Sequence, residues 1–165
     1  LEASSAASDV YKRQAMYREA FNELKAGNYQ KSSDLFNELD LMHPYSRWAS
    51  KGQLMSGFAL YQANKYEEAI FALNKFINLN PNDKNLDYAF YLKGYCYYER
   101  MNEVSRDQVI AKKAIQTFNE LKNKFPTSKY SLKAVNHIKL LNNQLAGYEM
   151  NVCLLYTSPS PRDAS

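Results

Sequence analysis

Small and bulky hydrophobic residues recur along the chain with a helical period, and the same pattern appears three times. In each copy a small residue is followed four positions later by a bulky apolar residue, and by another three positions after that. These offsets place all three on one face of a helix. A proline twelve residues after the small residue ends the helix, because the residue before a proline is driven out of the α region. The copies start at Ser32, Ala69 and Ala114 and end at Pro44, Pro81 and Pro126.

These prolines lie 37 and 45 residues apart, which is close to the period of tetratricopeptide repeats. Small residues recur after them, and Gly57 and Gly94 occupy positions where neighbouring helices must approach closely. The pattern predicts an all-α chain, a tetratricopeptide-type solenoid of helical hairpins with about three and a half repeats. The expected helices span residues near 15–26, 29–42, 47–63, 66–79, 84–100, 106–124 and 128–149.

A residue that can cap a helix stands two positions after each proline, at Ser46, Asp83 and Ser128. Its side-chain oxygen can accept from the free backbone N–H groups of the following helix. The third repeat is longer around residues 100–107, where Ser105 and Gln108 fit a capping box. We therefore predict an extended inter-repeat loop, containing Arg106 and Asp107, that closes in an ordered helix start.

The two ends of the chain differ in composition from everything between them. Residues 1–14 are small and polar without an apolar period, and residues 153–165 crowd Ser, Thr and Pro together. Both resemble translated sequencing-adapter read-through, so they are interpreted as non-native or disordered flanks. The repeat array is predicted over the interval between them, residues 15–152, with repeats near 15–44, 45–81 and 82–126 and a partial repeat at 127–152.

Composition and motifs argue against catalysis. The net charge of +4 is mild and the basic residues are spread along the chain, so nucleic acid is not an expected partner. No apolar run approaches the roughly 18 residues that span a bilayer. Gly-rich phosphate loops, paired metal-binding histidines and nucleophile elbows are all missing from the sequence. We therefore expect no catalytic site, cofactor or metal; an enzyme would need a catalytic domain beyond the ends of this chain.

Individual cysteines and histidines fit structural roles. Cys96 occupies the repeat position of Ala59, which favours a small core residue over a nucleophile. Cys153 falls in the C-terminal flank, too far from Cys96 in sequence to imply a disulfide framework. His43 precedes a proline and His137 lies within a predicted helix, and both are expected at a helix end or in solvent.

The remaining candidate for function is a binding surface, because the first helix of each hairpin lines the concave side of such arrays. Those helices carry four tyrosines that form a stripe in the third repeat, together with other aromatic and apolar residues. About half of the stripe is expected to pack against the next hairpin, and the rest to reach water or a partner. The candidate peptide-binding residues of these helices are Tyr17, Phe21, Leu54, Phe58, Tyr61, Tyr88, Tyr91, Tyr95 and Tyr98.

The segment at residues 43–48 holds the chain's only tryptophan. Trp48 is predicted to cover the seam between repeats. Arg47 beside it carries a guanidinium suited to carboxylate capture.

Longer blocks of sequence resemble the BamD family, the outer-membrane lipoproteins of the β-barrel assembly machinery in Gram-negative bacteria. The match runs in order through the predicted array and includes the long loop of the third repeat. A generic tetratricopeptide array would not share the LDYAFYLKG or SRDQ sequences. The matching blocks are HPYSRWASKGQLM (43–55), NKFINLNPNDKNLDYAFYLKGYCYYE (74–99), SRDQ (105–108) and FPTSKYSLKAVNHIKLLNNQLAGYEMNV (125–152).

The resemblance implies a non-enzymatic scaffold on the periplasmic face of the outer membrane, held by a lipid anchor. Such a protein would bind the central β-barrel assembly subunit, other lipoproteins of the machinery, and the C-terminal targeting signal of unfolded outer-membrane proteins. That signal is an extended strand ending in an aromatic residue and a carboxylate, which suits the concave aromatics together with Arg47 and Lys51. The resemblance places signal recognition in the N-terminal repeats and the main subunit contact in later repeats, mostly beyond this chain.

An alternative is another periplasmic tetratricopeptide scaffold, of the kind that organises Tol-type envelope machinery. The upstream sequence would separate the two readings, because a lipobox supports the first and an N-terminal coiled coil supports the second. Neither a signal peptide nor a lipobox is visible within this chain.

Overall fold

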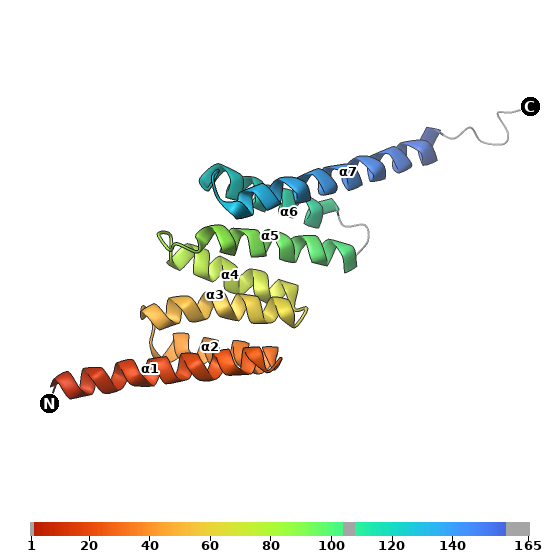
Figure 1. Cartoon of the computed structure of the whole chain (residues 1–165). Helices are drawn as coiled ribbons and strands as arrows, with labels where there is room; N and C mark the ends of the chain where they lie inside the picture. The colour runs from red at the N-terminus through yellow and green to blue at the C-terminus, as the bar shows by residue number, and fades with distance from the viewer. Residues whose placement is uncertain (1, 104–107, 158–165) are drawn as a thin grey trace, which may run out of the picture.

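The computed structural model describes residues 2–103 and 108–157, and these ranges form seven α-helices and no strands. The helices stack as successive layers along the molecule (Figure 1). The predicted all-α solenoid of helical hairpins is confirmed. The helices are α1 (Glu2–Lys25), α2 (Tyr29–Met42), α3 (Arg47–Gln62), α4 (Tyr66–Leu79), α5 (Leu86–Glu103), α6 (Gln108–Lys124) and α7 (Lys129–Thr157).

The packing of the helices defines an inner and an outer side. Each helix packs against the next, and in addition α1 contacts α3, α3 contacts α5, and α5 contacts α7. Within the described ranges, the backbones of α2, α4 and α6 do not pack against one another, although Lys75 of α4 pairs with Asp40 of α2. The first helices of the hairpins therefore converge on the concave side, and the second helices spread apart on the outside.

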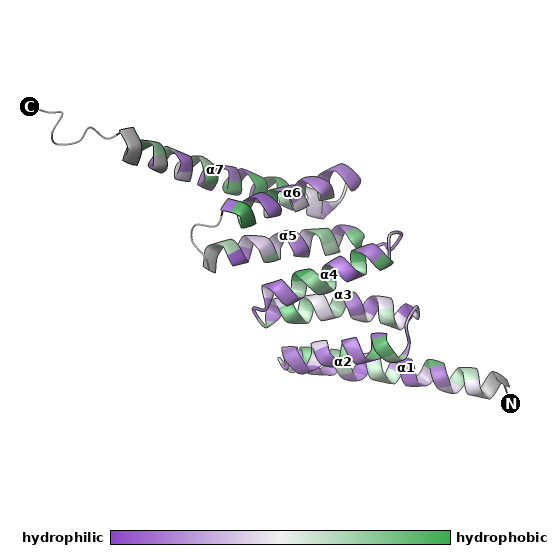
Figure 2. Cartoon of the chain, turned by 180° about the vertical axis from the view of Figure 1, so that it is seen from behind, coloured by the Kyte–Doolittle hydropathy of each residue, from purple (hydrophilic) through white to green (hydrophobic). Residues whose placement is uncertain are grey.

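The core consists of the residues that the repeated pattern predicts. Every small and bulky position of the three copies is at most 4% exposed, including the phenyl rings of Phe36, Phe76 and Phe118. Full burial of one such side chain contributes on the order of 2 kcal/mol. Both hydrophobic and hydrophilic residues lie along each helix, as the alternating green and purple ribbons of Figure 2 show.

Two glycines allow the hairpins to close tightly, as predicted. A Cβ atom on Gly57 would lie 2.8 Å from the Leu73 side chain, and one on Gly94 would lie 2.6 Å from the Phe118 ring. These distances are shorter than van der Waals contact, so α3 approaches α4, and α5 approaches α6, only because the side chain is missing.

The turns within hairpins use residues that tolerate a positive φ. Gly27 adopts φ 84° between α1 and α2, and Asn64 adopts φ 59° at the matching position between α3 and α4. Between hairpins, Ser46 Oγ accepts from Ala49 N at 3.0 Å, which confirms it as the cap of α3. Ser128 Oγ likewise accepts from Tyr130 N at 3.1 Å at the start of α7.

The start of α5 differs from the prediction. Asp83 Oδ1 accepts from Asn85 N at 2.8 Å, and the helix begins at Leu86 instead of residue 84. The carboxylate therefore stabilises the turn before the helix and not its first turn.

The terminal helices are longer than expected. α1 begins at Glu2 and α7 reaches Thr157, whereas the sequence predicted a start at residue 15 and an end at residue 149. Residues 2–14 contain neither Gly nor Pro, so nothing in them stops a helix. That the flanks are non-native stays a prediction. Among the described helices, none is both long and apolar enough to cross a membrane.

One predicted feature cannot be compared with the structure. The extended loop with Ser105, Arg106 and Asp107 lies outside the described residues. The helices on either side of it, α5 and α6, end at Glu103 and begin at Gln108.

Candidate functional site

Aromatic side chains from three helices meet on the concave side. Tyr95 of α5 lies between the layers, because its ring centroid is 5.8 Å from that of Tyr61 on α3 and 5.3 Å from that of His137 on α7. Phe58 extends the group along α3, with its ring 6.3 Å from Tyr61. We call this group the concave aromatic belt: Phe58, Tyr61, Tyr88, Tyr91, Tyr95, Tyr98, Tyr130 and His137.

Helix α7 covers part of the predicted tyrosine stripe. The ring of Tyr130 lies 5.2 Å from Tyr88 and 5.4 Å from Tyr91, and His137 lies 5.3 Å from Tyr98. Each of the four stripe tyrosines nevertheless keeps an intermediate exposure. The stripe therefore packs against the next hairpin, as expected, and still presents ring edges to solvent; binding at those edges stays a prediction.

His137 was expected at a helix end or in solvent, and this expectation is wrong. Its ring stacks on Phe118, with centroids 5.4 Å apart and planes 11° from parallel, and its Nε2 lies 3.2 Å from the Tyr91 hydroxyl. Its Nδ1 is buried without a hydrogen-bond partner. Burial lowers the pKa of His137 below the ordinary 6.5, against the opposing influence of Glu99, so the ring favours its neutral form.

The position of His137 within its helix could have revealed this burial. It lies three residues after Ala134 and four before Leu141, both fully buried, so it shares their face of α7.

The hydroxyls of Tyr88 and Tyr95 stay protonated over the physiological range. Burial raises the pKa of Tyr88 to about 12. Burial also raises the pKa of Tyr95, and a hydrogen bond with Glu99 raises it further. A neutral phenol can donate to a carbonyl or carboxylate, so the belt can offer both ring surface and hydrogen bonds to an extended peptide.

A second aromatic group lies at the seam between the first two hairpins. Trp48 of α3 packs on Tyr17 of α1 at 5.1 Å, which places it across the seam as predicted. Tyr17 also contacts Phe36 at 5.4 Å and stacks with Phe21 at 6.3 Å. We call these four rings the Trp48 cluster.

Two cations stand over the Trp48 cluster. Lys51 Nζ lies 5.0 Å and Arg47 Cζ lies 5.8 Å from the Trp48 ring, which is within cation–π distance. Both side chains are exposed, and neither pairs with a carboxylate in the described part of the chain. They can therefore receive a carboxylate from outside.

Leu54 differs from the other predicted site residues. It is 7% exposed and belongs to the core, so it offers little surface to a partner. Cys96 is fully buried, as its repeat position predicted, and burial raises the pKa of its thiol to about 12.

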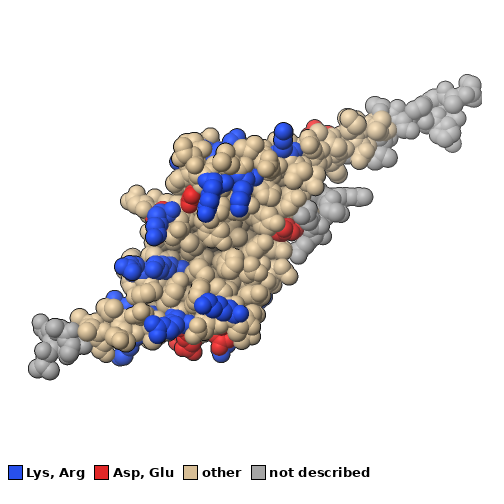
Figure 3. Space-filling view, in the orientation of Figure 1, with Lys and Arg blue, Asp and Glu red and all other residues tan. Residues whose placement is uncertain are grey.

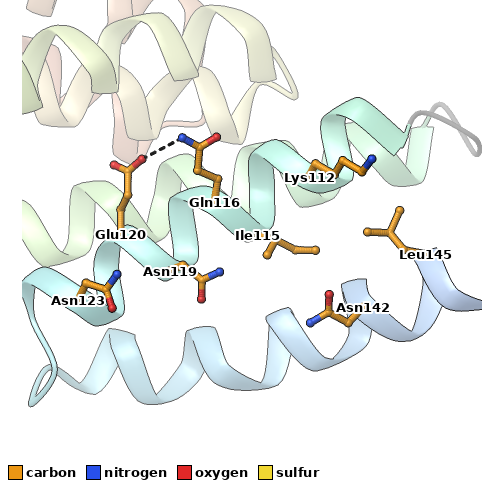
Figure 4. Close-up of a pocket in the computed structure, with 8 residues that line it drawn as sticks. All are labelled: Lys112, Ile115, Gln116, Asn119, Glu120, Asn123, Asn142 and Leu145. Atoms are coloured by element: carbon orange, nitrogen blue, oxygen red, sulfur yellow. Dashed lines mark hydrogen bonds between the residues drawn. The ribbon is translucent and has the colours of Figure 1, made fainter.

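The structure also has grooves that the sequence did not indicate. One of about 560 Å³ lies between α6 and α7 and is lined largely by amide side chains, among them Asn119, Asn123 and Asn142 (Figure 4). Gln116 Nε2 donates to Glu120 Oε1 at 3.4 Å on its rim. Another, of about 470 Å³, crosses α2, α3 and α4 beside the exposed Leu41 and Phe71. The sequence could not indicate these grooves, because they form only where side chains from different helices meet in the folded chain.

Comparison with known proteins finds one matching family and several similar proteins. The YfiO family, described as outer membrane lipoprotein, matches residues 9–160. A protein named outer membrane protein assembly factor BamD from Caulobacter vibrioides is 37% identical over 137 residues, which are 83% of this chain and 45% of that protein. Proteins of the same name from Rickettsia prowazekii and Neisseria meningitidis are 34% and 33% identical over 86% of this chain, and over 56% and 57% of their own lengths.

The chain thus spans about half the length of the curated relatives it matches. The resemblance read from the sequence blocks is confirmed.

Proposed function

The chain belongs to the YfiO family of outer-membrane lipoproteins, and we propose on this basis that it forms part of a non-enzymatic scaffold for outer-membrane protein assembly. The names of its relatives, which are assembly factors, support this role. Its place is the periplasmic face of the outer membrane. Its protein partners are the central β-barrel assembly subunit and other lipoproteins of that machinery.

The concave side binds the C-terminal segment of unfolded outer-membrane proteins, which ends in an aromatic residue and a carboxylate. The observation that carries this proposal is the concave aromatic belt, whose tyrosines stay partly exposed and in which Tyr88 and Tyr95 keep protonated hydroxyls. Tyrosine provides a large contact area with little side-chain entropy to lose, so it suits ligands that arrive unfolded. The belt supplies the apolar contact and the hydrogen bonds for the strand.

The carboxylate of the segment binds at Arg47 and Lys51. These cations are exposed and face no carboxylate of the described chain, so a ligand does not have to displace an internal ion pair. A guanidinium can hold both oxygens of a carboxylate at once.

The test is the binding of two synthetic peptides that end in phenylalanine, one with a free carboxylate and the other with a C-terminal amide. Calorimetric titration of the wild-type chain should show tighter binding of the acid by about tenfold, the size of a charge-assisted hydrogen bond. Arg47→Gln/Lys51→Gln should remove this preference. Tyr95→Ala should weaken both peptides to the same extent, because it removes ring area and a hydroxyl that serve the strand of either peptide and not its terminal carboxylate.

Lys112→Gln/Lys113→Gln provides a matched control, since it removes two exposed cations from α6. It should leave both affinities unchanged. The proposal fails if neither peptide binds, or if the control removes the preference for the acid as effectively as the variant at Arg47 and Lys51.

A further inference from the structure

Cations recur at one position of every repeat. A lysine or arginine stands three residues after each helix-ending proline, at Arg47, Lys84 and Lys129. In the first and third of these repeats another lysine follows four residues later, Lys51 and Lys133. Since the hairpins stack in register, equivalent positions lie at the same end of the helices, where α2, α4 and α6 end (Figure 1).

Lys124, in the last turn of α6, lies at this end too. This end of the helices lies on the left in Figure 3, and most of the blue side chains occupy the left-hand half of the face that is drawn. We call these residues the basic edge: Arg47, Lys51, Lys84, Lys124, Lys129 and Lys133.

Ion pairing does not explain the basic edge, although five of its cations also lie over aromatic rings of the chain: Arg47 and Lys51 over Trp48, Lys124 over Phe90, and Lys129 and Lys133 over Tyr130. All six side chains are exposed, and within the described residues none forms an ion pair. The first turns of α3 and α7 contain no acidic residue, so their cations meet the positive ends of the helix dipoles without compensation. The nearby carboxylates of Asp83 and Asp87 accept hydrogen bonds from Asn85 N and Ser128 Oγ respectively.

Exposed apolar side chains accompany these cations at the same end. Met42 and Leu79, at the ends of α2 and α4, are 58% and 56% exposed, and Leu132 in the first turn of α7 is 69% exposed. Tyr45 projects furthest, since it is 97% exposed. It adopts φ 65° in the turn before α3, a conformation that an aromatic residue rarely takes.

We propose that the basic edge binds the surface of an anionic phospholipid membrane. The ammonium and guanidinium groups would contact headgroup phosphates, while Tyr45 and Leu132 enter the region just below them. Cations interleaved with apolar and aromatic side chains are the combination that such an interface favours.

The arrangement favours a membrane over an acidic polypeptide. The exposed apolar side chains are spread over three inter-helix levels, at residues 42–45, 79 and 132, and are not gathered into one groove. A row of separate contacts along one end matches an extended, fluid surface. The beginning of α1 lies on the same side of the molecule (Figure 1).

Flotation of the full chain with lipid vesicles tests the proposal. The protein should float with phosphatidylglycerol–phosphatidylcholine vesicles and not with pure phosphatidylcholine, and added salt should weaken the binding. The variant Lys84→Gln/Lys124→Gln/Lys129→Gln/Lys133→Gln should lower the partition coefficient more than about tenfold, since each cation near an anionic surface contributes to attraction. Arg47 and Lys51 are left intact, so the peptide site proposed above is unaffected.

A matched control removes the same number of charges from the opposite end. Lys25, Lys65, Lys112 and Lys113 lie where α1 ends and where α4 and α6 begin, and all four are exposed. Their joint replacement by glutamine should change the partition coefficient less than about twofold, because the lower net charge weakens the long-range attraction only slightly. Equal losses in both quadruple variants would mean adsorption by net charge alone and would overturn the proposal.

A second variant tests the apolar contribution at constant charge. Tyr45→Asn/Leu132→Gln keeps every cation, and asparagine tolerates the backbone conformation at position 45. Its partition into anionic vesicles should fall severalfold, and unchanged binding would contradict the insertion of these side chains. Circular dichroism should show wild-type helix content in all variants.

The remaining outcome concerns an acidic polypeptide. If the chain ignores anionic vesicles but binds a poly-glutamate peptide, and the variant at Lys84, Lys124, Lys129 and Lys133 loses that binding, the edge serves a protein partner and the membrane proposal is wrong. Binding of the aromatic peptide is measured separately, so the failure of one proposal leaves the other standing.

Discussion

The Trp48 cluster and the concave aromatic belt both place aromatic rings on first helices, yet they differ in what surrounds the rings. In the belt, Tyr91 meets the rings of Tyr95, Phe118, Tyr130 and His137, so aromatic side chains link α5 to α6 and α7. In the Trp48 cluster, the rings close one seam and the outer side carries exposed cations. The belt therefore combines packing with partly exposed rings, whereas the Trp48 cluster adds exposed cations that form no ion pair within the described residues.

The largest effect should come from removing a ring of the belt that contacts rings on three helices. Tyr91→Ala should lower the free energy of unfolding by about 3 kcal/mol, because it leaves a cavity among rings from three helices. Tyr98→Ala should cost about 1 kcal/mol, since within the described residues its ring contacts are those to Tyr95 and His137. Urea unfolding followed by circular dichroism measures both losses of stability. Equal losses would show that Tyr91 contributes no more to packing than Tyr98 does.

A pair of glycines sharpens the contrast between packed and open parts of the array. Gly94→Ala should destabilise the chain by about 1–2 kcal/mol, because the methyl group would overlap the buried Phe118 ring. Gly147→Ala meets nothing within 4 Å on α7 and should stabilise it by about 0.5–1 kcal/mol through helix propensity. The same unfolding measurement should give opposite signs, and a stabilising Gly94→Ala would contradict the close approach of α5 and α6.

Protonation of His137 provides a smaller perturbation inside the belt. Burial lowers its pKa in the folded chain, so the unfolded chain binds the proton more tightly. Its contribution to stability is therefore fully present above the ordinary value of 6.5 and is lost as the pH falls through the lower, folded pKa.

Melting temperatures at about pH 7.5 and about pH 5 should reveal this loss in the wild-type chain. In His137→Phe, which keeps a flat ring over Phe118, the difference between the two pH values should be smaller. His43 remains in both proteins and serves as the internal control. An identical pH dependence in the two proteins would argue against the burial of His137.

The smallest effect on stability should come from the cations of the Trp48 cluster. Arg47→Gln/Lys51→Gln should change the free energy of unfolding by no more than about 0.5 kcal/mol, because both side chains are exposed and form no ion pair within the described residues. The same variant should lose its preference for the free peptide acid. A large loss of stability would mean that these cations hold the seam together and would weaken their assignment to recognition.

Local signals in the sequence predicted the fold well. The repeated small and bulky positions all became core, and the contacts of Gly57 and Gly94 confirm the close approach of their helices. The serine caps formed as expected at α3 and α7. The candidate site was less predictable. The sequence showed the tyrosine stripe as one face of a helix, but it did not show that Tyr130 and His137 cover part of that stripe. These residues come from α7, and Tyr91 and His137 are 46 positions apart in the chain.

The sequence by itself determined that this chain forms helical hairpins of the tetratricopeptide type. Helical period, helix-ending prolines, caps and turn residues act within a few positions of one another, so they can be read directly from the order of residues. Only the tertiary structure decided that His137 packs among tyrosines, and that cations scattered along the chain gather along one edge. Both depend on how repeats stack, because stacking brings together residues that the sequence holds more than thirty positions apart, such as Arg47, Lys84 and Lys129.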